Sequence, residues 1–282
     1  MKKQKVWLVT GASRGFGLEI VKAALAAGDK VVATVRSNPE KLQAQLNNEN
    51  LFVTIPDVTN EQQAKEVANL STSKFGRIDV LVNNAGFGLL SAVEEASNAE
   101  VKANYEANVF GLLNVTRGVL PFMRKERKGH IINLSSVGGL TGIIGWGLYG
   151  STKFAVEGIT EALSKELAPL GIYATAVEPG FFRTDFLDQS SLTRSANSIE
   201  DYAETVGDMR NYATQVNQKQ PGSAEKLAQA ILKIANAEKP PVHLPLGKDT
   251  LQLFKEKMDK FNADIEAWHE VITGTDHDDD VA

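Results

Sequence analysis

The chain opens with a short apolar run that passes through a glycine-rich turn into an amphipathic stretch. Residues 6–10 read Val-Trp-Leu-Val-Thr, glycine occupies positions 11, 15 and 17, and apolar side chains recur at helical spacing over residues 18–28. A strand, a glycine turn and a helix in this order present the backbone N–H groups of a helix N-terminus, where a pyrophosphate can bind. Glycine allows the tight turn and close backbone approach that such binding needs. The segment predicts either a dinucleotide-binding turn with an unusual Gly-x-x-x-Gly-x-Gly spacing or an ordinary βα turn.

Strand-like and helix-like segments alternate along the rest of the chain. Their order predicts an α/β fold, a single doubly wound (Rossmann-type) parallel sheet of about seven strands flanked by helices over residues 1–282. The apolar runs lack polar alternation, as expected of strands that are covered on both faces. Further strands are expected at 31–35, 51–55, 80–82, 131–134, 172–177 and 242–246. Helices are expected at about 39–47, after the strand at 51–55 and ending near residue 75, and at 98–125, 149–167 and 223–236. A kink or break is expected at Pro121.

Composition narrows the class of protein. The chain has 282 residues, of which 43% are hydrophobic and 23% charged, as in a soluble globular protein with one large core. Its net charge of −5 gives no reason to expect nucleic acid or a membrane as a partner. Cysteine is absent and the four histidines lack metal-ligand spacing, so no metal site is expected. No apolar run reaches transmembrane length and the start lacks signal-peptide features, so we expect a cytoplasmic protein.

Three side chains carry the clearest chemistry. Tyr149 and Lys153 are four residues apart, so a helix places both on one face, and Ser136 follows the apolar run 130–134. An ammonium group beside a phenol favours the phenolate and lowers the phenol pKa. A serine hydroxyl next to both can hold a carbonyl or alcohol oxygen. This set can move a proton on or off an oxygen while hydride moves on or off the adjacent carbon.

Together with the opening turn, these residues resemble the short-chain dehydrogenase/reductase family over roughly residues 5–185. The matching segments, in the family's order, are Thr10–Gly17, Asn83–Gly86, Asn108, Ser136, Tyr149–Lys153 and Pro179–Thr184. The resemblance implies that Tyr149 is the general acid/base and that Lys153 lowers its pKa. It also implies that Ser136 holds the substrate oxygen and that Asn108 holds a water of a proton relay. Without the resemblance, Asn108 could be a polar kink, and segments 83–86 and 179–180 ordinary ends of strands.

The resemblance also implies a set of cofactor contacts. The glycine turn would bind the pyrophosphate, Asp57 would accept from the adenine amino group, and Thr184 would bind the nicotinamide carboxamide. The residues expected at the cofactor are Gly11, Ser13, Arg14, Gly15, Phe16, Gly17, Arg36, Asp57, Val58, Asn84, Ala85, Gly86, Tyr149, Lys153, Pro179, Gly180, Phe182 and Thr184.

The end of the second strand indicates which nicotinamide cofactor is used. An acidic residue there would bind the ribose hydroxyls of NAD, but Val35 occupies the position and Arg36 follows it. Arg14 lies in the glycine turn, so two guanidinium groups and the Ser13 hydroxyl can surround one phosphate. The alternative is that both arginines are solvated surface charges. Charge complementarity favours NADP(H) over NAD(H).

Substrate specificity is expected to come from residues 185–221 and from the loop after Gly86. Apolar side chains at 87–90, 138–146 and 181–187 suit a lipophilic carbonyl or secondary alcohol, although the same aromatics could form core or a subunit interface. The length of 185–221 predicts a lid with a helix near 198–216.

The C-terminal extension 248–282 contains a helical stretch, 248–271, that could cover the pocket or pack against a second subunit. The resemblance implies a homodimer or homotetramer. An acidic run follows at 275–280.

Two other functions share this fold. One is a non-catalytic NADP(H)-binding sensor or regulator, which would not need the phenol–ammonium pair. The other is a nucleotide-sugar epimerase or dehydratase, for which a longer substrate domain and a different glycine spacing are expected. The prediction is therefore an NADP(H)-dependent carbonyl reductase with a small-molecule carbonyl or alcohol substrate.

Overall fold

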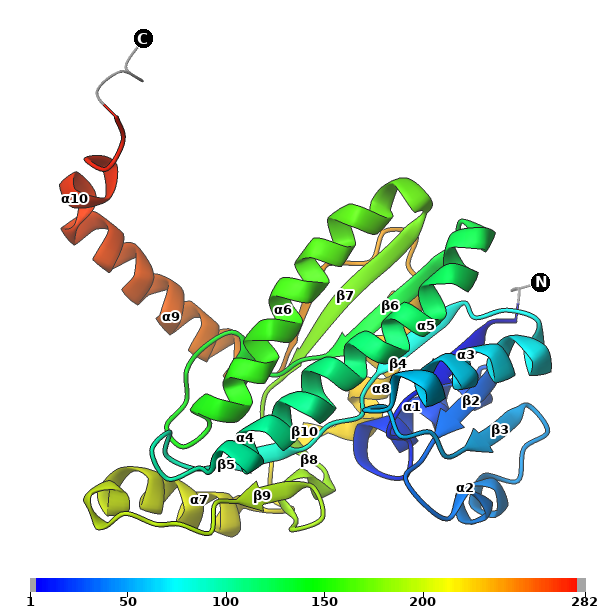
Figure 1. Cartoon of the computed structure of the whole chain (residues 1–282), viewed down its shortest axis with the longest axis horizontal. Coiled ribbons are helices and arrows are strands. Elements are labelled where there is room, and N and C mark those ends of the chain that lie inside the picture. The colour runs from blue at the N-terminus through cyan, green and yellow to red at the C-terminus, as the bar shows by residue number, and fades with distance from the viewer. Residues whose placement is uncertain (1–3, 278–282) are drawn as a thin grey trace.

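The computed structural model describes residues 4–277, and a parallel sheet lies at its centre (Figure 1). The strand order is β11-β7-β6-β4-β1-β2-β3 and every neighbouring pair is parallel. The strands are β1 (Val6–Val9), β2 (Lys30–Thr34), β3 (Leu51–Thr54), β4 (Val80–Asn83), β6 (Gly129–Leu134), β7 (Ile172–Pro179) and β11 (His243–Leu246). The order reverses between β1 and β4, which is where doubly wound sheets bind ligands. The predicted fold class is confirmed.

Helices cover both faces of the sheet (Figure 1). They are α1 (Gly15–Ala26), α2 (Pro39–Leu46), α3 (Glu61–Phe75), α5 (Gly111–Glu126), α6 (Gly147–Leu167) and α8 (Ala224–Ala235). Alternate residues of β1 explain why the strands read as continuous apolar runs. Trp7 and Val9 pack in one buried cluster with α1 and α8, whereas Leu8 packs in another with α3 and α5. Both clusters consist of buried apolar side chains, so the hydrophobic effect stabilises the sheet from each side.

The helix expected over residues 98–125 is interrupted, but not at Pro121. It comprises α4 (Asn98–Tyr105), a wide π-helical turn (Glu106–Phe110) and α5, which continues through Pro121. Of the kink or break expected at Pro121, the break is therefore wrong, and the kink stays a prediction. The π turn coincides with Asn108, whose side chain bonds to neighbouring segments, and such bulges are common at functional sites.

Segment 185–221 contains more irregular structure than expected. The helix expected near 198–216 is divided into a 3₁₀ turn (Glu200–Tyr202), a π turn (Ala203–Gly207) and α7 (Asp208–Val216). Short strands that no sequence pattern predicted tie the segment to the body: β5 (Gly88–Leu90) pairs with β9 (Leu192–Arg194), and β8 (Phe182–Arg183) with β10 (Gly222–Ser223). Strands of two or three residues carry too few side chains to show a period.

The C-terminal extension points away from the body (Figure 1). It consists of α9 (Lys248–Ala267) and α10 (His269–Thr273), so the helix expected over 248–271 divides at Trp268. Part of the predicted acidic run, residues 278–280, lies outside the described residues. Among residues 4–277, no helix is both long and apolar enough to cross a bilayer.

Candidate active site

The glycine turn before α1 is packed so tightly that it excludes a side chain at Gly17. A Cβ at Gly17 would lie 2.3 Å from the Gly11 carbonyl oxygen and 2.6 Å from the Asn84 side-chain nitrogen. Gly11 has a φ of +66°, which L-residues with side chains rarely adopt. The turn therefore needs glycine both for its backbone angle and for close packing.

Asn84 fixes this turn from the neighbouring strand end. Its Nδ2 donates hydrogen bonds of 2.9 Å to the carbonyls of both Thr10 and Gly11. The backbone N–H groups of Asn84 and Ala85 donate to the Thr10 hydroxyl, at 2.9 and 3.0 Å. Asn84 thus supports the shape of the turn by joining the ends of β1 and β4.

A cavity of about 680 Å³ opens in front of the turn, at the carboxyl ends of the strands. Twelve of the residues predicted at the cofactor line it: Gly11, Ser13, Arg14, Gly15, Phe16, Arg36, Asp57, Val58, Asn84, Ala85, Gly86 and Thr184. Gly17, in the first turn of α1, does not line this cavity. Tyr149, Gly180 and Phe182 line a smaller adjoining pocket. Lys153 and Pro179 do not line either cavity. The size of the cavity and the backbone cradle of the glycine turn fit a dinucleotide.

The two arginines predicted at the cofactor converge on one point. Arg14 donates 2.7 Å hydrogen bonds to the Ser190 carbonyl and to the Ser191 hydroxyl. Arg36 donates to the same Ser190 carbonyl at 3.4 Å, although it follows a different strand. Val35, which follows β2, is buried, so the end of this strand presents no carboxylate of its own. The arrangement places two guanidinium groups around a single acceptor oxygen.

Tyr149, Lys153 and Ser136 come together at the start of α6. Tyr149 and Lys153 lie one turn apart on α6 and both are buried. The Lys153 ammonium donates to the Leu134 carbonyl at 2.8 Å and lies 5.6 Å from the centre of the Tyr149 ring. Ser136 follows β6, and its hydroxyl accepts from the Gly138 N–H at 3.1 Å. The end of β6 thus holds both the lysine and the serine beside the phenol.

The electrostatics of the phenol differ from the sequence-based expectation. Burial raises the Tyr149 pKa above its usual range, and the Ser136 hydroxyl only partly opposes this effect. Burial also lowers the Lys153 pKa to about 8, against the opposing charge of Glu157. In the protein alone the phenol is therefore not acidic, because burial raises its pKa more than the Ser136 hydrogen bond lowers it. The predicted effect of Lys153 on this pKa stays a prediction.

Asn108 uses all its side-chain polar groups within the protein. Its Nδ2 donates to the Phe87 carbonyl at 3.0 Å and to the Thr152 hydroxyl at 3.1 Å. Its Oδ1 accepts from the Phe87 N–H at 3.0 Å. Asn108 therefore ties the loop after β4 to α6, next to Lys153, and its predicted relay role stays a prediction.

An aromatic pocket of about 80 Å³ adjoins the phenol. The Trp146 and Phe186 rings stack at 6.1 Å between centres, and Phe186 lies 5.5 Å from the Tyr149 ring. Phe186 belongs to segment 185–221 and lines both cavities, so the two adjoin. The pocket lining is Ser136, Val137, Gly138, Ile143, Trp146, Tyr149, Gly180, Phe181, Phe182, Phe186, Leu187 and Gln220.

Comparison with known proteins decides the family. The sequence pattern of the short chain dehydrogenases matches residues 5–195. This chain belongs to the short-chain dehydrogenase/reductase family. It is 37% identical over 270 residues to oxidoreductase BOA17 of Botryotinia fuckeliana, covering 95% of this chain and 97% of that protein. It is also 37% identical over 251 residues to the 3-ketodihydrosphingosine reductase of Bacteroides thetaiotaomicron, covering 89% and 90%.

Solved structures agree with this assignment. A short-chain dehydrogenase from Streptomyces avermitilis matches with a TM-score of 0.90 and 39% identity, covering 98% of this chain and all of that one. ElxO with NADP bound matches with a TM-score of 0.74 and 28% identity, covering 89% and 100%. The protein is thus an oxidoreductase with a small-molecule substrate and a nicotinamide cofactor, which argues against the non-catalytic sensor.

Sequence reasoning missed one residue that shapes this site. Asp249, at the start of α9, accepts a 2.6 Å hydrogen bond from the Phe181 N–H, 68 positions earlier. A Cβ at Gly180 would lie 2.2 Å from the Asp249 carboxylate, so a side chain there would displace this carboxylate from its present position. The first turn of α9 therefore holds the Pro-Gly segment beside the pocket. No local pattern links the two, because only the fold brings them together.

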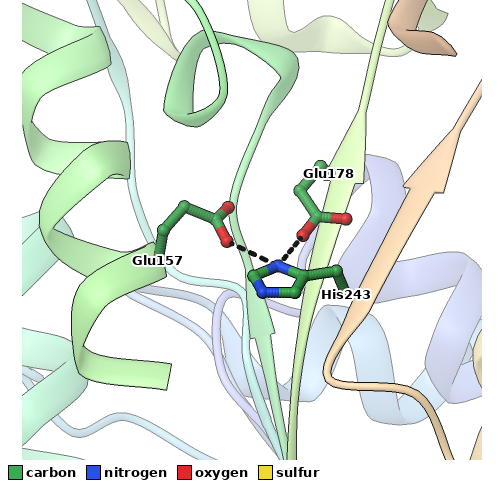
Figure 2. Close-up of side chains that lie close together, drawn as sticks. All are labelled: Glu157, Glu178 and His243. Atoms are coloured by element: carbon green, nitrogen blue, oxygen red, sulfur yellow. Dashed lines mark hydrogen bonds and ion pairs between the residues drawn. The ribbon is translucent and has the colours of Figure 1, made fainter. Parts of the chain in front are cut away.

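Two buried carboxylates, Glu157 and Glu178, lie beside His243 (Figure 2). Glu157 is one turn beyond Lys153 on α6. His243 Nδ1 lies 3.0 Å from a carboxylate oxygen of Glu178 and 3.3 Å from one of Glu157. The three potential ligand atoms lie within 4.8 Å of one another, so this group could hold a divalent cation. The spacing of the histidines along the sequence did not indicate this possible cation site, because the three residues come from α6, β7 and β11.

The Glu178 carboxyl of this pair is expected to keep its proton at neutral pH. Burial, and then the charge of Glu157, raises the Glu178 pKa from its ordinary value near 4.5 to about 9. Burial raises the Glu157 pKa as well. Two carboxylates cannot both be charged this close together in a site that excludes water.

This proton predicts how stability depends on pH. Between pH 4.5 and about 9 the folded protein keeps the proton on Glu178, whereas the unfolded chain has lost it. The folded state binds more protons, so the free energy of unfolding should fall as pH rises through this window, by at most about 1.4 kcal/mol per pH unit. Glu178→Gln should flatten that slope in urea unfolding measured from pH 5 to 9. Glu166→Gln, an exposed change on the same α6, should leave it unchanged. An equal slope in wild type and Glu178→Gln would contradict the retained proton on Glu178.

Proposed function

We propose that this enzyme is an NADP(H)-dependent carbonyl reductase that interconverts a lipophilic carbonyl compound and its secondary alcohol. The observation that carries the proposal is the position of the Tyr149 phenol. It lines an aromatic pocket that adjoins a cavity of dinucleotide size, with Ser136 and Lys153 beside it. A nicotinamide bound in the larger cavity would supply the hydride for reduction and accept it in oxidation.

The chain's own residues handle the oxygen of the substrate. In reduction, the Tyr149 phenol donates its proton to the carbonyl oxygen as negative charge develops there. The raised pKa of this phenol keeps it protonated at neutral pH, as a general acid must be. Ser136 donates a hydrogen bond to the same oxygen and so orients the carbonyl. Lys153, with a pKa of about 8, retains a proton below that pH and stabilises the phenolate that forms.

The remaining predicted contacts hold the cofactor in this scheme. The glycine turn and the N-terminus of α1 would bind the pyrophosphate. Asp57, Val58 and segment 84–86 would hold the adenosine half. Pro179, Gly180, Phe182 and Thr184 would hold the nicotinamide, on a segment that Asp249 keeps in place.

NADP(H) is proposed over NAD(H) because of the two arginines. In the protein alone, the Ser190 carbonyl accepts from both Arg14 and Arg36, so it occupies the place of a phosphate oxygen. A 2′-phosphate offers several such oxygens and full negative charge, which suits paired guanidinium groups. ElxO, a structural relative, is known with NADP bound.

The cofactor choice predicts the effect of Arg36→Asp. A carboxylate there would repel the 2′-phosphate, so NADPH affinity should fall at least about tenfold, a loss of about 1.4 kcal/mol. NADH affinity should stay the same or rise. Arg124→Asp, at an exposed site in the last turn of α5, is the matched control and should change neither. Fluorescence titration of both cofactors measures this, and unchanged NADPH affinity in Arg36→Asp would overturn the NADP assignment.

A lipophilic substrate is proposed because the pocket is aromatic. Trp146 and Phe186 pack against the phenol ring, and Phe181 and Phe182 line the same pocket. These side chains offer few polar groups to bind sugar hydroxyls. One relative with 37% identity is a 3-ketodihydrosphingosine reductase, whose name describes a long-chain ketone. Segment 185–221, which carries Phe186, is proposed as the lid of this pocket.

A substrate panel tests the proposed function. Aliphatic ketones of increasing chain length, aromatic ketones, keto sugars and the corresponding alcohols are supplied with NADPH or NADH, and absorbance of the reduced cofactor is followed. We expect NADPH-dependent reduction with kcat/KM rising with chain length. Turnover of keto sugars alone would refute the lipophilic pocket, and absence of turnover with every carbonyl would refute the reductase.

A further inference from the structure

The C-terminal helix α9 exposes an apolar stripe that no other described residue covers. The stripe, which we name the α9 seam, consists of Leu251, Phe254, Met258, Phe261 and Ile265 on α9 and of Trp268, which directly follows α9 and whose N–H still bonds to the Asp264 carbonyl of the helix. Each side chain is between 36% and 62% exposed. The main contacts of α9 with the body are with β11 and the turn at 137–139, near its first residues, and beyond Lys257 every residue of α9 is exposed. The rest of the helix extends into solvent (Figure 1).

The spacing of the seam indicates what kind of surface covers it. Successive seam residues are 3, 4, 3, 4 and 3 positions apart, the heptad pattern of a coiled coil. A helix packed on a globular body usually presents a broader apolar face, whereas a strict seam of this kind packs along one other helix. The partner is therefore expected to be a helix with a matching seam.

The order of side-chain types shows that the seam matches itself in reverse. Aliphatic residues and methionine occupy one heptad position (Leu251, Met258, Ile265) and aromatics the other (Phe254, Phe261, Trp268). In an antiparallel pair of identical helices, each layer of side chains brings the first heptad position of one helix, the aliphatic or methionine position, against the second heptad position of the other helix, the aromatic position. Every layer then combines one aromatic with one smaller side chain, so all layers have similar volume. A parallel pair would instead stack tryptophan on tryptophan and leucine on leucine.

The charge of α9 and the apolar area of the seam are also consistent with a second copy of this chain as the partner. Residues Lys248–Ala267 contain four lysines and five acidic residues, so two copies do not repel strongly and an anionic membrane has no attraction for the helix. Side chains of these sizes and exposures present on the order of 600 Å² of apolar surface per helix. That is close to the roughly 800 Å² per partner of a standard protein interface.

We propose that the α9 seam binds the α9 seam of a second copy of this chain in an antiparallel, two-fold symmetric pair. The layers would be Leu251 with Trp268 of the other copy, Phe254 with Ile265, and Met258 with Phe261. Because Asp249 in the same helix holds the Pro-Gly segment of the pocket, this interface would join the sites of the two copies through one rigid helix.

Mass measurement is the first test. We expect the particle mass of the full chain, from light scattering after gel filtration, to halve in Phe261→Glu, because the change places two like charges near the two-fold axis. Ala263→Glu adds the same charge to the opposite, exposed face of α9 and should leave the mass unchanged. Circular dichroism and NADPH titration confirm that both variants remain folded. A mass that is equal in wild type and Phe261→Glu overturns the proposal, as does a monomeric wild type at micromolar concentration.

Disulfide crosslinking tests the antiparallel order, since the natural chain has no cysteine. Positions 251 and 268 lie about 25 Å apart within one helix, too far for a disulfide in the same chain. The double variant Leu251→Cys/Trp268→Cys should form crosslinked dimers on oxidation, whereas each single variant should not. Crosslinked dimers from both single variants would show parallel helices and overturn the proposal. Binding of monomeric wild type, but not of Phe261→Glu, to vesicles of anionic phospholipid would assign the seam to a membrane surface instead and would equally overturn it.

Discussion

Tyr149→Phe should reduce the turnover number for carbonyl reduction by a factor on the order of a thousand or more, because the general acid is removed. Binding of NADPH should change by less than about threefold, since the phenol hydroxyl is expected at the substrate oxygen and the ring still fills its buried position. Stopped-flow absorbance of NADPH gives the rate of hydride transfer, and fluorescence titration gives the dissociation constant.

Tyr105→Phe is the matched control for this prediction. The Tyr105 hydroxyl donates a 2.9 Å hydrogen bond to Ser151 on α6 but lines neither cavity. This variant also loses one phenol hydroxyl near α6, so it reports the structural part of the effect, and turnover should remain within about threefold of wild type. Wild-type turnover in Tyr149→Phe would remove the phenol from the mechanism.

Gly17→Ala should abolish useful cofactor binding. The new methyl group would meet the Gly11 carbonyl at 2.3 Å and the Asn84 side chain at 2.6 Å, so the glycine turn would have to move. We expect NADPH affinity to fall by about a hundredfold or more, because the turn and the N-terminus of α1 shift together. The free energy of unfolding should fall by about 1–3 kcal/mol, as for other overpacked sites.

Gly158→Ala separates this effect from the general cost of replacing a glycine. Gly158 lies within α6, and a Cβ there meets no atom within 4 Å. Alanine should therefore stabilise the helix, by about 0.5–1 kcal/mol, and leave NADPH affinity unchanged. Normal NADPH affinity in Gly17→Ala would show that the cofactor does not rest on this turn.

Local sequence features were sufficient for the sheet and for the catalytic set. The apolar runs predicted the strands of the main sheet because both faces of each strand are buried, which removes polar residues from the run. Tyr149 and Lys153 could be placed together because four residues span one helical turn. The break predicted at Pro121 was wrong, because α5 accommodates the proline and the interruption follows the contacts of Asn108.

The sequence by itself determined that this chain forms a doubly wound sheet with a glycine turn and a phenol–ammonium pair. Each of these features can be predicted from short segments of the chain. Only the tertiary structure decided that Asp249 holds the Pro-Gly segment and that Glu157, Glu178 and His243 meet. It also decided that the Tyr149 pKa rises rather than falls. Contacts between distant residues follow from strand order and from the path of segment 185–221, and a pKa follows from how much water the fold removes. No local pattern of side chains predicts either the contacts between distant residues or the pKa of a buried group.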